Sequence, residues 1–246
     1  RRGLAGAGTQ TAGLAAGGMT PTKVTCTEEY SGTSWASSGA LIVGRDGLRA
    51  AGTQNATLVS GGRNQAAPAG GGQCCTEEFN GSAWSLGGAL SNGSYGRTST
   101  GTQNSAFVAG GYSLTTAPTG GCSTNITEEY NGTAWSTGGL MSTSRANAVS
   151  SAAGVVNDAT VSGGLTTPSY ACIGNTEKYN GVAWSNDTST IRSDIGSNVG
   201  AGIGNNFISI GGYSAPTEVT TTLEYNFINP VNCGLYCFWN SLSYTA

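Results

Sequence analysis

Short apolar runs end in a pair of glycines at five places along the chain. The clearest are Ala106-Phe107-Val108-Ala109 and Phe207-Ile208-Ser209-Ile210. The five glycine pairs are Gly17-Gly18, Gly61-Gly62, Gly110-Gly111, Gly163-Gly164 and Gly211-Gly212. Runs of this length, rich in β-branched and aromatic residues and bounded by glycine, predict buried strands.

A second motif follows each glycine pair, and its clearest copy is TEEYNGTAW at residues 127–135. Related segments start at Thr27, Thr76, Thr176 and Thr222, so successive starts are 49, 51, 49 and 46 residues apart. The recurring positions, which we interpret as structural, are Glu28, Tyr30, Trp35, Glu77, Phe79, Trp84, Glu128, Tyr130, Trp135, Glu177, Tyr179, Trp184, Glu224, Tyr225 and Trp239. Such a fixed period is typical of a repeat architecture.

Each repeat contains the signals for two hairpins. Asn131-Gly132 predicts a two-residue type I′ turn, which would pair Tyr130 with Thr133 and place Tyr130 and Trp135 on one packed face. Upstream, Gly101-Thr102-Gln103-Asn104 predicts the turn between a strand that starts near Arg97 and the apolar strand. The sequence therefore predicts four antiparallel strands per unit of about 49 residues.

The order Arg, apolar strand, Gly-Gly, Glu-x-Tyr, Trp resembles the kelch repeat and covers Arg2 to Trp239. It departs from the kelch pattern in its short Tyr-to-Trp spacing and in the last copy, where the segment 227–233 replaces Asn-Gly. The resemblance implies an all-β fold, a five-bladed kelch-like β-propeller with four antiparallel strands per blade. It would form one domain over residues 1–246, with blades at approximately 1–38, 39–87, 88–138, 139–187 and 188–246.

Radial stacking is the usual way for such a unit to bury an aromatic face that it cannot bury alone. A β-solenoid is the structural alternative, although its rungs are usually shorter. The terminal units would either pack face to face and close the ring or belong to a longer array. The combination of TEEYNGTAW and GTQNA is also similar to tandem kelch-like proteins of bacteriophages of aquatic bacteria, which implies a virion appendage or decoration.

Composition adds a prediction about location. Only 9% of the residues are charged, 41 are glycine and none is histidine, so the surface consists mainly of hydroxyl, amide and glycine groups. Such surfaces are common in secreted, cell-surface and virion proteins. The ten Lys and Arg residues are scattered, which argues against nucleic acid as a partner, and no apolar run is long enough for membrane insertion.

Catalysis finds no support in the sequence. Without histidine there is no conventional catalytic triad and no imidazole ligand of the kind that kelch-fold copper oxidases require. There is no Cys-x-x-Cys pair to suggest zinc. We therefore expect a protein that is not an enzyme, with no catalytic residues, no cofactor and no metal.

Seven cysteines suggest a disulfide set formed in an oxidising, extracellular setting. Four of them, Cys26, Cys75, Cys122 and Cys172, lie within five residues before their motif. The best single candidate pair is Cys233 with Cys237, which would close a short loop where the Asn-Gly turn is missing. Six Asn-x-Ser/Thr sequons also occur, and those at Asn80 and Asn131 arise from the repeated turn itself.

The repeated glutamates have a structural interpretation. A buried charge must be paired, so an acidic residue at the same place in every unit predicts a hydrogen-bond acceptor for backbone or for an arginine. The candidate partners are Arg45, Arg97, Arg145 and Arg192.

Function is expected in the segments that differ most between copies, 63–74, 112–125, 165–175 and 213–221, because loops on a rigid scaffold commonly carry recognition. Their aromatic candidates for binding are Tyr112, Tyr170 and Tyr213. The leading hypothesis is a virion structural or host-attachment protein of a bacteriophage. Its partners would be other virion proteins, itself, or a host-surface glycan or protein. The alternatives are a lectin-like propeller with one sugar site per blade, which the dissimilar loops disfavour, and a purely structural filament or capsid-decoration subunit.

Overall fold

The computed structural model describes residues 1–64, 72–113, 121–151, 156–190, 199–203, 206–210, 213–214, 217–218, 222–226 and 240–242. Every regular element within these ranges is a β-strand, and every strand pairing is antiparallel. The all-β prediction is therefore confirmed. Within the same ranges, no helix exists that could cross a membrane.

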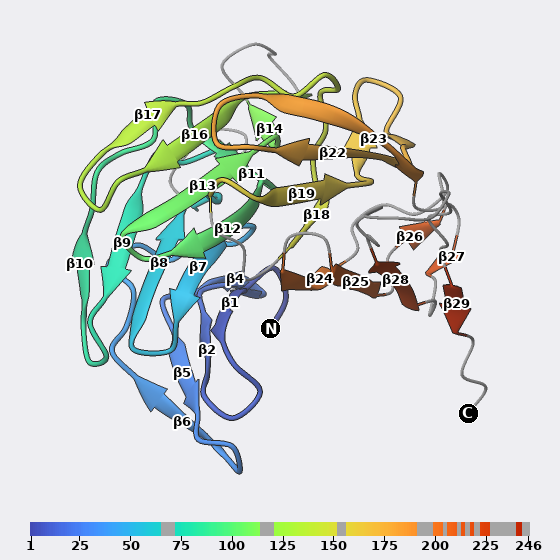
Figure 1. The fold of residues 1–246 in the computed structure, drawn as a ribbon. Helices are drawn as coiled ribbons and strands as arrows, with labels where there is room; N and C mark the ends of the chain where they lie inside the picture. The colour runs from blue at the N-terminus through green and yellow to red at the C-terminus, as the bar shows by residue number, and fades with distance from the viewer. Residues whose placement is uncertain are drawn as a thin grey trace.

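Five four-stranded sheets follow one another along the chain, and we call them units 1 to 5 (Figure 1). Unit 1 comprises β1 (Ala5–Gly8), β2 (Gly13–Ala16), β5 (Thr27–Tyr30) and β6 (Trp35–Ser38). Unit 2 comprises β7 (Arg49–Thr53), β8 (Ala56–Ser60), β9 (Thr76–Phe79) and β10 (Trp84–Leu86). Unit 3 comprises β12 (Thr98–Thr102), β13 (Ser105–Ala109), β16 (Thr127–Tyr130) and β17 (Trp135–Thr137).

Unit 4 comprises β18 (Val149–Ser150), β19 (Ala159–Ser162), β22 (Asn175–Tyr179) and β23 (Trp184–Thr190). Unit 5 comprises β24 (Val199–Ile203), β25 (Asn206–Ile210), β28 (Thr222–Asn226) and β29 (Asn240–Leu242). In every unit the strands pair in the order in which they occur, so the predicted four strands per unit are confirmed. The first strand of each unit contacts the first strand of the next.

Shorter strands lie between the second and third strands of units 1, 3, 4 and 5, and those of units 3, 4 and 5 fall in the segments that vary most between copies. They are β3 (Met19–Thr20) with β4 (Thr22–Lys23), β14 (Tyr112–Ser113) with β15 (Cys122–Ser123), β20 (Leu165–Thr166) with β21 (Ala171–Cys172), and β26 (Tyr213–Ser214) with β27 (Thr217–Glu218). β11 (Ser94–Tyr95) joins the second of these hairpins by pairing with β14. These short strands form small sheets that are separate from the four-stranded sheets.

The predicted register of the Asn-Gly hairpin is wrong by two residues. Tyr130 lies opposite Trp135 rather than Thr133, and Asn131 donates its backbone N–H to the carbonyl of Ala134. The Oδ1 atom of Asn131 accepts from the N–H groups of Thr133 and Ala134, at 3.0 and 2.9 Å. This side-chain bonding moves the turn one residue along, to Gly132 and Thr133. Because only Gly132 has a positive φ, of 90°, the turn is not type I′.

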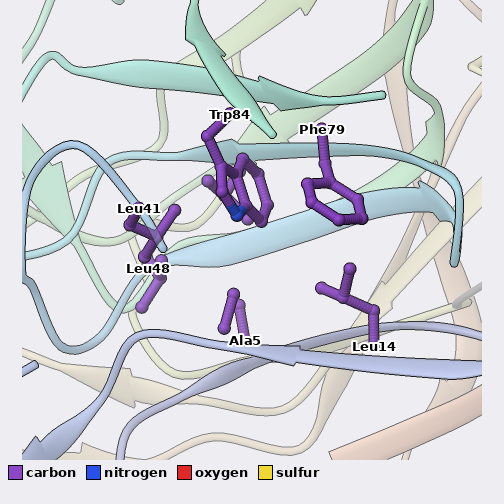
Figure 2. Close-up of a cluster of buried hydrophobic side chains, with 8 residues drawn as sticks. Ala5, Leu14, Leu41, Leu48, Phe79 and Trp84 are labelled. Carbon is purple, nitrogen blue, oxygen red and sulfur yellow. The ribbon is translucent and has the colours of Figure 1, made fainter. Parts of the chain in front are cut away.

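The tyrosine and tryptophan still share one face, as predicted, because a shift of two residues keeps the side-chain alternation. Their ring centroids are 4.9 Å apart in unit 3, and units 1, 2 and 4 repeat the stack with Tyr or Phe. The apolar core lies between neighbouring sheets. Figure 2 shows Trp84 and Phe79 of unit 2 facing Leu14 and Ala5 of unit 1.

One hydrogen bond recurs at the three interfaces between units 1 and 2, 2 and 3, and 3 and 4. The indole N–H of Trp84 donates to Oγ1 of Thr27 in the preceding unit at 2.9 Å. Trp135 donates in the same way to Thr76, and Trp184 to Thr127, each at 2.9 Å. The tryptophan and the threonine of the repeated motif therefore join successive units.

A tyrosine makes the second inter-unit bond. The hydroxyl of Tyr130 donates to Oε1 of Glu78, and that of Tyr179 donates to Oε1 of Glu129. Burial, and then the bond to the carboxylate, raise the pKa of each of these tyrosines to about 12.

These tyrosines make stability fall with alkaline pH. Between pH 10 and 12 the unfolded chain loses phenol protons that the folded chain keeps, so their contribution is complete below pH 10 and is lost as the pH rises. We expect Tyr130→Phe to make this fall shallower, because Phe79 shows that the position accepts phenylalanine. Urea unfolding between pH 8 and 11 measures the slope, and an identical slope in the variant would contradict the assignment.

The predicted pairing of glutamate with arginine is confirmed in three units. Arg45 lies 3.1 Å from Glu77, and both side chains are fully buried. Arg145 lies 2.6 Å from Glu177, and Arg97 lies 3.4 Å from Glu128. In unit 1 it is Arg1 that bonds Glu28, at 2.5 Å, with the carboxylate partly exposed. The fourth predicted partner, Arg192, lies outside the described residues.

The described part of the chain contains none of the expected disulfides. No disulfide joins the five that the structure describes, Cys26, Cys74, Cys75, Cys122 and Cys172. Neighbouring thiols point to different ion pairs, because Cys75 lies beside Arg45 whereas Cys74 lies near Arg97 and Glu128. The candidates Cys233 and Cys237 lie outside the described residues. The described cysteines therefore give no support to the prediction of an oxidising, extracellular setting.

Candidate binding site at the central cavity

A chain of backbone hydrogen bonds links the units where their first strands begin. The N–H of Gly47 donates to the carbonyl of Gly3 at 2.8 Å, Gly96 donates to Gly47 at 3.1 Å, and Asn147 donates to Gly96 at 2.7 Å. All four residues have positive φ, between 52° and 66°. Glycine, and secondarily asparagine, tolerate this conformation, which explains these residue types at this position.

The first strands of the five units line a cavity of about 700 Å³, which we call the central cavity. Its lining comes from all five units, with Ala5 and Gly6 from β1, Arg49 and Ala50 from β7, Thr98 and Ser99 from β12, Val149 and Ser150 from β18, and Gly200 from β24. A cavity of this size accommodates a small organic ligand.

Four residue pairs, which we call the rim pairs, lie at the end of the cavity where the first strands begin. Each joins the residue before the linked glycine or asparagine to the residue after the glycine pair. They are Arg2 with Met19, Asp46 with Arg63, Tyr95 with Tyr112, and Ala146 with Leu165. The pairs occupy one structural position yet differ completely in chemistry, whereas the strands around them repeat.

The rim pair of unit 2 is charged. Arg63 donates to Oδ2 of Asp46 at 2.6 Å, and the Nζ of Lys23 lies 3.6 Å from Oδ1 of the same carboxylate. Asp46 is buried, whereas Arg63 is about one third exposed. The guanidinium of Arg63 also lies over the ring of Tyr95, 4.5 Å from its centroid, which is a cation–π contact.

An aromatic row continues from this arginine. Tyr95 stacks against Tyr112 at 5.1 Å, and Tyr112 lies 6.3 Å from Tyr170, measured between ring centroids. Tyr112 is buried, and burial together with the neighbouring phenols and Cys172 raises its pKa to about 12. Tyr170 is 53% exposed and has a positive φ of 52°, which is unusual for a bulky residue. The row therefore ends in an exposed aromatic ring on the variable segment of unit 4.

Two of the three predicted binding tyrosines, Tyr112 and Tyr170, thus meet in one cluster. The side chain of Tyr213 lies outside the described residues. The sequence analysis missed Tyr95, Asp46 and Arg63 as members of a site. The signal was present, because two of these precede the linked glycine and the third follows a glycine pair, but only the strand register aligns these positions.

Positively charged side chains and a row of aromatic rings thus lie beside the central cavity, and these are features of a binding site. Among the described residues there is no group of three or more His, Cys, Asp or Glu side chains that could hold a metal ion. The sequence matches no family model. It matches no curated protein either, so the likeness to the kelch repeat depends on the motifs and their spacing.

Proposed function

We propose that this chain is a non-enzymatic binding module, a five-bladed kelch-like propeller that presents a variable rim and variable loops to a glycan or protein. The observation that carries this proposal is the contrast between repeated strands and unlike rim pairs. A purely structural array would need no chemical difference between Asp46–Arg63, Tyr95–Tyr112 and Ala146–Leu165, which occupy the same position. Recognition on a rigid scaffold needs such a difference.

We also propose that the five units close into a ring. Unit 1 has a tryptophan in the position that contacts the preceding unit elsewhere, and this tryptophan has no such partner among the described residues. Trp35 occupies the position of Trp84, but it is 54% exposed whereas Trp84 is 8% exposed. Unit 5 offers the missing half, because Thr222 in β28 is paired with Ile210 just as Thr27 is paired with Ala16. Closure would let the Trp35 indole donate to Thr222.

Two further contacts of unit 1 fit the same closure. Glu224 has the register of Glu29, so it would accept from the hydroxyl of Tyr30 as Glu78 accepts from Tyr130, in place of the bond that this hydroxyl now donates to the carbonyl of Gly32 at 2.8 Å. Gln54 donates to the carbonyl of Tyr30 at 2.8 Å, and Gln103 repeats this bond to Phe79 at 2.7 Å.

Gln10 is the equivalent residue of unit 1 and would donate to the carbonyl of Tyr225. Three separate side chains of unit 1 therefore fit three groups of the same β28 strand.

Binding is tested most directly at the exposed end of the aromatic row. We expect Tyr170→Ala to weaken binding to host-cell envelopes or their isolated glycans by about ten- to a hundredfold, because an exposed aromatic ring commonly anchors a partner. Surface-immobilised wild type and variant, titrated with the same envelope preparation, give the ratio.

The matched control is Leu86→Ala, which truncates another exposed side chain, 67% exposed, in β10 and away from the cavity lining. Equal binding by Tyr170→Ala and wild type would contradict a role for the aromatic row. Correct folding of the variant is established by an unchanged unfolding midpoint.

The location that we propose is the surface of a bacteriophage virion, and it is supported by the low charge, the absence of histidine and the likeness of TEEYNGTAW to phage arrays. Other virion proteins would then be partners. Antibody labelling of purified particles, viewed by negative-stain microscopy, tests this. Label on a capsid or tail supports the virion proposal, and label confined to a soluble fraction favours the secreted lectin-like alternative.

A further inference from the structure

A single arginine breaks the repeat at the wall of the central cavity. Arg49 opens β7, opposite Ser60. The residues with the same register in the other units are Ala5, Thr98, Val149 and Val199. Four units therefore fold with a small or apolar residue at this position, so the fold does not require an arginine there.

Arg49 has no carboxylate partner among the described residues. Its one side-chain hydrogen bond runs from Nη1 to the adjacent carbonyl of Leu48 at 3.3 Å. Burial lowers the pKa of its guanidinium, and no acid in the described part of the chain offsets this effect. By contrast Arg45, Arg97 and Arg145 each have a glutamate partner. A guanidinium stays charged at neutral pH, so Arg49 places an uncompensated cation in the wall.

The described lining of the cavity is positive although the chain is not. Its charged residues are three arginines, Arg2, Arg49 and Arg63, and one acid, Asp46. That acid is already bonded to Arg63 and lies near Lys23. The net charge of the chain is −3, so the positive charge is a local property of the cavity. A hollow lined by one sign of charge concentrates ions of the opposite sign.

We infer that the central cavity binds a compact oxyanion, a carboxylate, sulfate or phosphate group carried by a small ligand, through the guanidinium of Arg49. The planar donor fork of arginine matches the oxygens of these groups. This inference deepens the proposed function, because the same cavity would hold the acidic part of a ligand whose remainder contacts the rim. Arg49 is then kept for binding at the expense of stability.

Arg49→Thr, which copies Thr98 of unit 3, tests the inference with two readouts of opposite sign. Without added anion the variant should unfold at the same or a higher temperature than wild type, because it loses an unpaired, partly buried charge. With sodium sulfate, at constant ionic strength set by sodium chloride, the thermal midpoint of wild type should rise more than that of the variant, because sulfate also stabilises folded proteins without binding to a site. By calorimetric titration the dissociation constant for sulfate should be about ten- to a hundredfold higher for Arg49→Thr than for wild type.

Lys178→Gln is the matched control, since it removes one positive charge that is paired with Asp187 at 2.8 Å, in β22 and away from the cavity lining. It should bind sulfate as wild type does. Parallel titrations with phosphate, glucuronate and glucose identify the source of the anion. Glucuronate binding that is absent for glucose points to an acidic sugar, and binding of inorganic anions alone points to a free ion.

Equal sulfate binding by wild type and Arg49→Thr would overturn the inference, and so would an equal loss in Lys178→Gln. Either result leaves the proposed function standing if Tyr170→Ala still loses envelope binding. Conversely, anion binding that depends on Arg49 together with unchanged envelope binding by Tyr170→Ala would refute only the role of the aromatic row.

Discussion

Replacing Glu77 with alanine should destabilise the protein by about 3–5 kcal/mol, the usual cost of removing one partner of a buried ion pair. Glu77 and Arg45 are both fully buried, 3.1 Å apart. The same carboxylate accepts from the backbone N–H groups of Ile42 and Val43, at 2.7 and 3.3 Å. Its loss therefore leaves a buried guanidinium without its counter-ion and two backbone donors without their acceptor. Urea unfolding at neutral pH measures the change.

The repeat supplies the control for this prediction. Glu28→Ala alters the same position in unit 1, where the glutamate side chain is 44% exposed, and should cost at most about 1 kcal/mol. Similar losses for Glu77→Ala and Glu28→Ala would show that burial of the pair is not the cause.

Unit 5 suggests a rescue for the lost pair. It has Leu223 at the register of Glu77 and Ile195 four residues before its first strand, where unit 2 has Arg45. The double variant Arg45→Ile and Glu77→Leu should recover part of the stability lost in Glu77→Ala, because an apolar pair can replace a buried ion pair.

Trp35→Ala should destabilise the protein as much as Trp84→Ala, by about 3–5 kcal/mol, if unit 1 closes against unit 5. Trp84 shows what the contact involves, since its ring is buried in the cluster with Leu14 and Leu41 and donates to Thr27. A ring closure would place Trp35 in the same surroundings on unit 5. Thermal and urea unfolding of the two variants give the comparison.

A loss below about 1 kcal/mol for Trp35→Ala, with a full loss for Trp84→Ala, would indicate an open array. If the loss in Trp35→Ala instead depended on protein concentration, unit 1 would be packing on another copy of the chain. A head-to-tail contact of that kind builds filaments when it does not close. That outcome would favour the purely structural alternative.

Much of the fold could be predicted from the sequence, because each strand is bounded by its own local signal. The glycine pair and the Glu-x-Tyr motif set the strands, and the need to pair a buried charge predicted the bond between Glu77 and Arg45. The turn register could not be predicted from Asn-Gly alone. It depends on the side chain of Asn131, which accepts two backbone N–H groups and moves the turn to Gly132 and Thr133.

The site was only partly predictable for a related reason. Tyr112 and Tyr170 stood out as aromatic residues in variable segments, whereas Tyr95 and Asp46 look ordinary in sequence. Their positions become equivalent only when the units are aligned by strand register. Arg49 was also missed, because its meaning depends on the alanine, threonine and valines that occupy the same place in the other units.

Closure of the ring is tested most directly by hydrogen exchange at the indole N–H of Trp35, followed by NMR in protein labelled with ¹⁵N-tryptophan. The closed propeller predicts that this proton exchanges as slowly as those of Trp84, Trp135 and Trp184, and that Thr222→Val, which removes the hydroxyl acceptor, accelerates it selectively. Exchange of the Trp35 proton at the rate of an indole in free solution, unaffected by Thr222→Val, would contradict the closed five-bladed ring.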